Sequence, residues 1–91
     1  MNAVHWRVEG KVQGVGFRWF VRETARRLDL AGWVANRPDG TVELAASGPD
    51  EVLERLRAAV REGPPGARVT GLVPLDAPPR DGLVRPFTIL R

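Results

Sequence analysis

Three basic side chains gather where a glycine-containing loop meets the start of a predicted helix. Lys11 lies in the loop, Arg18 falls in the first helical turn and Arg22 follows one turn later, with no acidic residue between Glu9 and Glu23. A first helical turn normally favours Asp or Glu, because its free N–H groups and the helix dipole make it locally positive. Cations at this point break a local rule, and such violations are typical of functional sites. The pattern predicts that a bound anion supplies the missing negative charge.

The glycines of this loop allow a ligand to approach the backbone closely. Gly14 and Gly16 have no side chain to shield the neighbouring N–H groups, and the helix that follows presents further free N–H groups. A phosphate or a similar anion fits both features. Residues 10–18 are therefore interpreted as an anion-binding strand–loop–helix.

Other catalytic chemistries have few residues to support them. The chain contains no cysteine and no tyrosine, and His5 and Ser47 are its only histidine and serine. A cysteine-based nucleophile or metal site is thus excluded, and a serine hydrolase triad would require His5 and Ser47 to meet. His5 falls on the solvent side of a predicted strand and is expected to be a solvated surface residue. Chemistry is left to Arg, Lys, Asn, Gln, carboxylates and backbone amides.

Length and composition fit one domain, over residues 1–91, with one modest core. The 91 residues are 43% hydrophobic and 27% charged, as in an ordinary globular chain. No apolar run approaches membrane-spanning length and the N-terminus lacks the apolar block of a signal peptide, which predicts a cytoplasmic protein with no membrane partner. The net charge of +3 comes almost entirely from arginine, since Lys11 is the only lysine. Arginine preference alone is weak support for a nucleic-acid partner.

Hydrophobic periodicity and turn residues predict seven elements. Pro38, Asp39 and Gly40 favour a tight hairpin turn, and Pro49 with the acids after it marks the start of the second helix. The region 76–82 is expected to be a surface loop. The predicted helices are one over residues 17–29, followed by a connection that ends at Gly32, and one that begins at Pro49 and ends at Gly63. The predicted strands cover residues 4–9, 32–37 and 41–46, with a short or edge strand over 67–73 and a last short strand over 86–90.

This order of elements is typical of one architecture. A β-α-β-β-α-β succession with a small terminal strand fits the ferredoxin-like split βαβ sandwich, an α+β fold with two helices on one face of an antiparallel sheet. Pro74 and Pro86 are expected to protect its edge strands, which favours a monomer. Trp6 shares the apolar phase of its strand and is expected in the core, whereas Trp19, beside the glycine loop, is expected to wall the ligand pocket.

Two segments resemble one family. The first follows a Gly-x-Val-Gln-Gly-Val-x-Phe-Arg order over residues 10–18, and the second combines a Gly-aromatic-x-x-Asn order over residues 32–36 with Gly40, Thr41, Val42 and Gly48. Both segments and their spacing resemble the signatures of the acylphosphatases, and the similarity spans essentially the whole chain. The resemblance implies an enzyme that hydrolyses the carboxyl–phosphate bond of a small-molecule acyl phosphate to a carboxylate and inorganic phosphate.

The resemblance also implies roles for particular residues. Arg18 would bind the phosphoryl group and Asn36 would hold the attacking water. Arginine offers a planar fork for two phosphate oxygens, and an asparagine amide can orient water without ionising. No metal or cofactor is expected, because arginine and loop amides supply positive potential. The expected phosphate-binding residues are Gln13, Gly14, Val15, Gly16, Phe17 and Arg18.

Two other functions remain open at this stage. The domain could serve as a non-catalytic binding or regulatory module, although the end of the chain at Arg91, shortly after the last strand, favours a free-standing enzyme. It could alternatively bind nucleic acid, since its arginines are interleaved with aromatic residues. The aromatic-rich RNA-binding signature of this architecture is absent from the sequence, which favours the enzyme.

Overall fold

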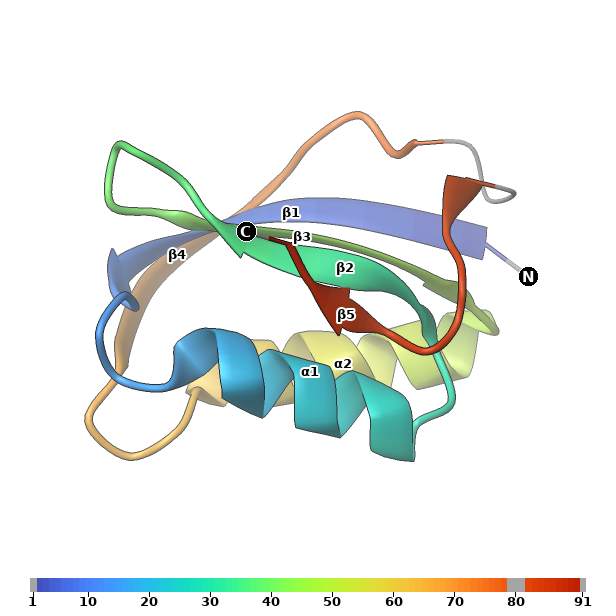
Figure 1. Ribbon diagram of the computed structural model, residues 1–91, viewed down its shortest axis with the longest axis horizontal. Helices are drawn as coiled ribbons and strands as arrows, with labels where there is room; N and C mark the ends of the chain where they lie inside the picture. The colour runs from blue at the N-terminus through green and yellow to red at the C-terminus, as the bar shows by residue number, and fades with distance from the viewer. Residues whose placement is uncertain (1, 79–81, 91) are drawn as a thin grey trace.

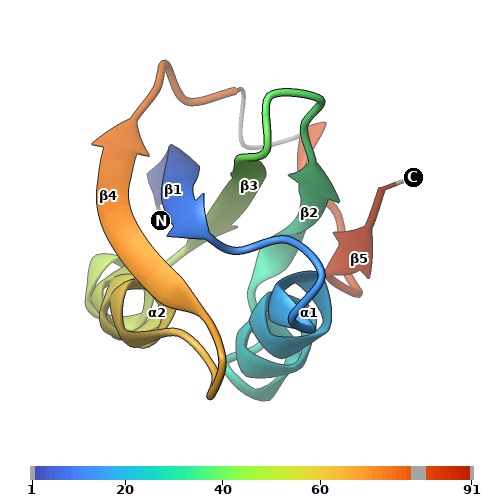
Figure 2. The same cartoon turned by 90° about the vertical axis from the view of Figure 1, so that its left-hand side faces the viewer.

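The computed structural model describes residues 2–78 and 82–90 and contains one five-stranded sheet covered on one face by two helices (Figures 1 and 2). The strand order is β4-β1-β3-β2-β5. The ferredoxin-like succession predicted from the sequence is therefore confirmed, with a short strand added at the β2 edge. The elements are β1 (Asn2–Lys11), α1 (Phe17–Arg27), β2 (Ala31–Asn36), β3 (Val42–Gly48), α2 (Asp50–Glu62), β4 (Arg68–Pro74) and β5 (Thr88–Ile89).

The main core lies between the sheet and the two helices. Each helix has apolar residues at 3.6-residue spacing on the face turned to the sheet, as predicted, and every second residue of β1 and β3 points toward them. Burial of one such Val or Leu side chain contributes about 1.5–3 kcal/mol. Phe87, just before β5, is also fully buried here. The core includes Trp6, Val8, Val12, Phe17, Val21, Ala25, Leu30, Val34, Val42, Leu44, Ala46, Leu53, Leu56, Val60 and Phe87.

The opposite face of the sheet carries a polar cluster that corrects the expectation for His5. Its Nε2 lies 2.5 Å from Oε2 of Glu43, its Nδ1 lies 2.9 Å from the carbonyl oxygen of Asp76, and its ring meets Trp33 edge-on. His5 is therefore half-buried and bonded rather than freely solvated. The reason is that the chain beyond β4 follows β1, where Leu75 donates its N–H to the His5 carbonyl, and covers a strand face that the sequence pattern assigns to solvent.

The four long strands form the predicted antiparallel sheet, and the short strand β5 is the exception. β1, β3, β2 and β4 pair antiparallel, but β5 pairs parallel to β2, with Trp33 opposite Thr88 and Val34 opposite Ile89. β4 and β5 lie at opposite edges of the sheet, so the chain between them does not form a tight hairpin. A long connection allows a strand to enter in either direction, so periodicity alone could not fix it.

The first helix ends two residues earlier than predicted. Arg27 is its last residue, and Asp29 adopts a left-handed conformation with φ of +57°. Asp tolerates this region better than most residues, so it makes the turn that we expected Gly32 to complete. Gly32 instead lies inside β2, where its N–H donates to the Val84 carbonyl at 3.0 Å.

Several strand bounds are longer or shorter than predicted. β3 continues to Gly48, two residues past the expected end, because β1 begins at Asn2 and supplies its partner. β4 is a seven-residue edge strand, and β5 is reduced to two residues. Of the loop expected over 76–82, residues 79–81 lie outside the described residues. No helix in the described ranges is long and apolar enough to cross a membrane.

Candidate functional site

The loop between β1 and α1 is anchored in the core at both ends. Val12 and Phe17 are each 1% exposed, and Val15 packs against the same core. Residues 13–16 therefore span a short distance between two fixed points. Hydrophobic burial at Val12 and Phe17 holds the loop backbone without using any of its polar groups.

The loop backbone alternates in a way that gathers N–H groups. Gly14 and Gly16 both have φ of +75°, whereas Gln13 and Val15 have negative φ. Such alternation turns successive N–H groups toward one point and forms an anion-binding concavity. Within the described part of the chain, no backbone N–H from Gln13 to Arg18 donates a hydrogen bond to another protein group. A Cβ at Gly14 or Gly16 would meet nothing within 4 Å, so the space in front of both residues is open.

Arg18 extends from the first turn of α1 into this open space. The helix has no acidic residue in its first turn, as the sequence predicted, and Gly16 at its N-cap supplies no side-chain hydrogen bond. The half-buried Arg18 forms no ion pair with a carboxylate among residues 2–78 and 82–90. Its positive charge and that of the helix end therefore add at the same point.

Asn36, the last residue of β2, faces the same space. Its strand phase is that of Val34, so its side chain lies on the helix-covered face of the sheet. Asn36 Oδ1 is buried and accepts no hydrogen bond from any described group. A buried acceptor without a donor is unfavourable by about 1–3 kcal/mol, and its persistence in a native fold needs a reason.

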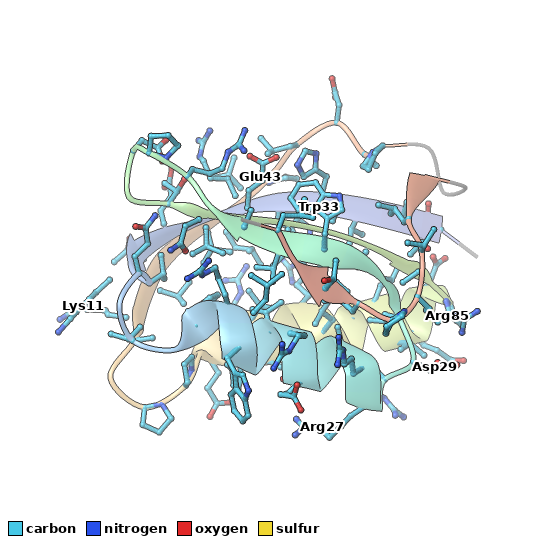
Figure 3. All side chains as sticks on the ribbon, viewed as in Figure 1. Lys11, Arg27, Asp29, Trp33, Glu43 and Arg85 are labelled. Carbon is cyan, nitrogen blue, oxygen red and sulfur yellow. The ribbon has the colours of Figure 1, made fainter. Side chains whose placement is uncertain are left out.

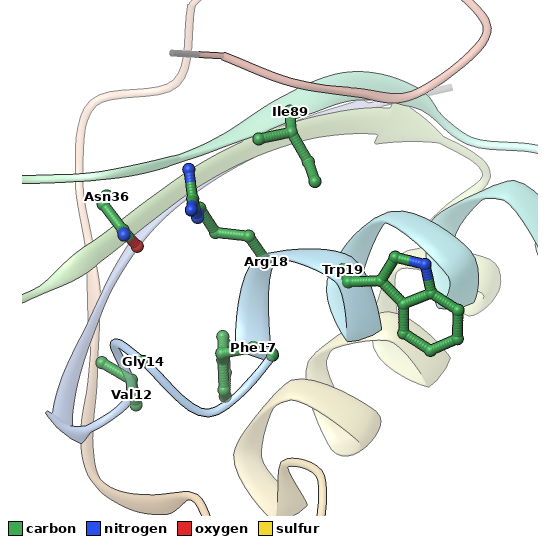
Figure 4. A pocket seen from close by; sticks show the side chains of 8 residues that line it. Val12, Gly14, Phe17, Arg18, Trp19, Asn36 and Ile89 are labelled. Atoms are coloured by element: carbon green, nitrogen blue, oxygen red, sulfur yellow. The ribbon is translucent and has the colours of Figure 1, made fainter.

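A cavity of about 180 Å³ joins these groups (Figure 4). Arg18 and Asn36 approach it from α1 and β2, so the structure brings together the two side chains that the sequence predicted to be catalytic. Gly14, Gly16 and Phe17 of the predicted phosphate loop also line it. Val12 and Ile89 line it as well and were missed by the sequence reasoning; Ile89 belongs to β5, where it pairs with Val34 of β2. The lining residues are Val12, Gly14, Gly16, Phe17, Arg18, Trp19, Asn36 and Ile89.

Trp19 lines the cavity as predicted, and Gln13 and Val15 belong to the loop whose backbone amides are predicted to bind phosphate. Trp19 is 59% exposed, and its indole ring projects away from Arg18 and Asn36 (Figure 4). The side chains of Gln13 and Val15 do not line the cavity, so only their N–H groups can serve it. Gln13 instead donates from Nε2 to the carbonyl oxygens of Arg37 and Thr41, at 2.8 Å each.

The charges around the cavity are of one sign. No carboxylate is among its lining residues, and the exposed Lys11 side chain extends from the end of β1 at the same end of the molecule (Figure 3). Nowhere in the described ranges do three or more His, Asp or Glu side chains gather as a metal-ion site would require. The arrangement therefore favours a small anionic ligand over a cation.

The family model, the sequence relatives and the solved structures that match this chain each cover most of its length. A family model described as Acylphosphatase matches residues 4–89. An acylphosphatase from Nitratidesulfovibrio vulgaris is 56% identical over 75 residues, which are 82% of this chain and 75% of that protein. The crystal structure of acylphosphatase from Bacillus subtilis is 42% identical, with a TM-score of 0.92 and 100% of both chains covered. In HypF from T. kodakarensis, 12% of that chain matches all of this one at 34% identity and a TM-score of 0.85.

The fold and the cavity define a class: a small ferredoxin-like α+β domain with a cationic, glycine-lined cavity at one end of its sheet. The family model covers nearly the whole chain, and the N. vulgaris and B. subtilis relatives are well above 30% identical. The chain belongs to the acylphosphatase family. It is accordingly an enzyme of the class that hydrolyses acyl phosphates.

Proposed function

We propose that this enzyme hydrolyses small acyl phosphates by holding the phosphoryl group in the loop of residues 13–18 and delivering water from Asn36. The observation that carries the proposal is that Arg18, Asn36 and the glycines of the loop line one cavity. The volume of about 180 Å³ suits a phosphoryl group with a small part of its acyl chain. The acyl group would then extend out of the cavity, and several acyl groups could be accepted.

The phosphoryl group is bound by complementary charge. Arg18 offers two parallel N–H donors to two phosphate oxygens, and the loop amides offer further donors without cost of reorganisation. Phosphoryl transfer depends mainly on positioning and on stabilisation of the charge on the equatorial oxygens. A cluster of donors supported by the N-terminus of α1 supplies both.

Asn36 orients the attacking water. Its buried, unpartnered Oδ1 is an acceptor for one water hydrogen, which leaves a water lone pair free to face phosphorus. The water oxygen forms a bond to phosphorus as the phosphorus–acyl oxygen bond breaks, and the carboxylate leaves with the electron pair. Asn36 is a poor base, so a phosphate oxygen of the substrate takes the water proton. The leaving carboxylate needs no proton, which is consistent with the absence of a carboxylate from the cavity lining.

Hydrolysis of benzoyl phosphate, followed by its ultraviolet absorbance, tests the proposal. We expect turnover that is unchanged in excess chelator, because Arg18 and the loop amides supply the positive charge. A pH–rate profile that requires an enzyme base near neutrality would contradict the transfer of the proton to the substrate. Binding of inorganic phosphate without hydrolysis would instead indicate a binding or regulatory module.

The nucleic-acid alternative has weaker support. Trp6 is 6% exposed in the core, Trp33 is half-buried on the opposite sheet face, and Trp19 is exposed on α1. The three rings therefore share no surface on which bases could stack. A salt-dependent shift of labelled RNA by the protein would revive this function.

A further inference from the structure

We propose that the Gln13 side chain is a positioning residue that fastens the anion-binding loop to the turn behind Asn36. This inference rests on the function proposed above, because it concerns how the spacing between the loop over residues 13–18 and Asn36 is held constant. These two parts of the site lie at the same end of the molecule (Figure 1). They come from segments that are separated by the whole of α1.

The two hydrogen bonds of Gln13 use both N–H donors of its side-chain amide. The carboxamide nitrogen carries two hydrogens, and it lies 2.8 Å from the Arg37 carbonyl oxygen and 2.8 Å from that of Thr41. Each N–H thus has its own acceptor. Gln13 is the only glutamine in the chain. Asn or Ser would be too short to reach across, and Glu would bring acceptors against acceptors.

The two carbonyls that Gln13 bonds also close the turn that follows Asn36. The Arg37 N–H donates to Thr41 O at 2.9 Å, and the Gly40 N–H donates to Arg37 O at 3.1 Å. Gln13 therefore adds a second donor to each of the two carbonyls on which the turn depends. Arg37 directly follows Asn36, so the tether acts one residue from the side chain that is proposed to hold water.

In the part of the chain that the structure describes, the other polar contacts of the loop do not connect it to the turn that follows Asn36. Val12 and Phe17 fix the loop to the core beneath it, but neither reaches the turn over residues 37–41 through a polar group. Among the described residues, the Gln13 carboxamide supplies all the hydrogen bonds that join residues 12–16 to that turn. A shift of about 1 Å between bound phosphate and water is enough to lower the rate about a hundredfold. A tether that fixes this distance therefore affects kcat.

A double-mutant cycle tests the tether. Gln13→Met keeps the size and the backbone N–H of the residue but removes both donors, and we expect kcat for benzoyl phosphate to fall roughly tenfold or more. In an Asn36→Ala background the same change should lower kcat by less than about twofold, because the water is already misplaced. Equal losses in both backgrounds would show that Gln13 acts independently of Asn36 and overturn the inference.

A matched control separates positioning from general stability. Arg85 also joins distant segments with two bonds, from Nη1 to the carbonyl and carboxylate oxygens of Asp29, at the end of the molecule away from Lys11 (Figure 3). Arg85→Met should leave kcat within about twofold of wild type. Gln13→Glu, which faces both carbonyls with oxygens, should lose more activity than Gln13→Met. Wild-type activity in Gln13→Glu would contradict the tether.

Amide hydrogen exchange tests the tether without turnover. Loss of the Gln13 donors should speed exchange of the Arg37 and Gly40 N–H groups about fivefold or more, since both close the turn. Arg85→Met should leave these two rates unchanged. If the wild-type enzyme does not hydrolyse benzoyl phosphate, the proposed function fails while the exchange rates still judge the tether. Unchanged exchange in Gln13→Met would overturn it.

Discussion

Oε2 of Glu43 lies 2.5 Å from Nε2 of His5, and Oε1 of the same carboxylate lies 2.8 Å from Nε of Arg37. Both nitrogens of the His5 ring face oxygen atoms, the second being the Asp76 carbonyl oxygen. The Glu43 carboxylate of β3 therefore joins β1 to the turn that follows Asn36. Gln13 joins the anion-binding loop to the same turn.

Replacement of Glu43 should destabilise the fold. Glu43→Gln removes the negative charge between His5 and Arg37 while keeping the side-chain shape, and we expect a loss of about 1–2 kcal/mol, since the Glu43 side chain is only 15% exposed. Urea unfolding measures the change. Glu54→Gln, at an exposed position of α2, should unfold at nearly the wild-type midpoint. Equal midpoints for the two variants would show that the cluster contributes no stability.

Arg18→Lys keeps a positive charge but removes the planar fork that two phosphate oxygens require. We expect a normal fold and a loss of activity on the order of a hundredfold, as when one preorganised donor is removed. Steady-state hydrolysis of benzoyl phosphate and circular dichroism measure the two effects. The control is Arg22→Lys on the same helix, whose guanidinium pairs with Glu23 at 3.1 Å. Similar rates for Arg18→Lys and Arg22→Lys would exclude a phosphate-binding role for Arg18.

Asn36→Ala should separate activity from stability. It removes the proposed water ligand, so kcat should fall by about a hundredfold. It also removes a buried acceptor that no described group satisfies, so the free energy of unfolding should stay the same or rise. Turnover assays and urea unfolding on the same preparations test both statements. A variant that is active at the wild-type rate would remove Asn36 from the mechanism.

Asp39 should titrate at a low pH in the turn that follows Asn36. The Thr41 hydroxyl and N–H both donate to Asp39 Oδ1, at 2.6 and 3.0 Å, and hold the pKa of this exposed carboxyl below its ordinary value of 3.8. Because the folded-state pKa is depressed, the stabilisation is present above the unfolded-state value and is lost as pH falls through the folded-state pKa. Thr41→Val should move the pKa of Asp39 back toward 3.8 in an NMR titration. An unchanged midpoint would mean that the hydroxyl contributes nothing.

The local sequence pattern was sufficient to predict those elements whose structure depends only on nearby residues. The amphipathic spacing of α1 and α2, the alternation in β1 and β3, and the Pro-Asp-Gly turn all depend on neighbours in the sequence. The absence of acids at the start of α1 was likewise visible without coordinates, and it led to the loop and to Arg18. Pairing with distant segments explains the errors: β5 took its direction from β2, and His5 was covered by the chain beyond β4.

The sequence by itself therefore determined which chemical groups the site contains: Arg18, Asn36 and the glycine-containing loop over residues 10–18. Only the tertiary structure decided their relation. It placed Arg18 and Asn36 in one cavity, left the Asn36 oxygen without a donor among the described groups, and bonded the Gln13 side chain to the turn over residues 37–41. The physical reason is that a side chain's type is local, whereas its partners depend on how distant strands and helices pack around one core.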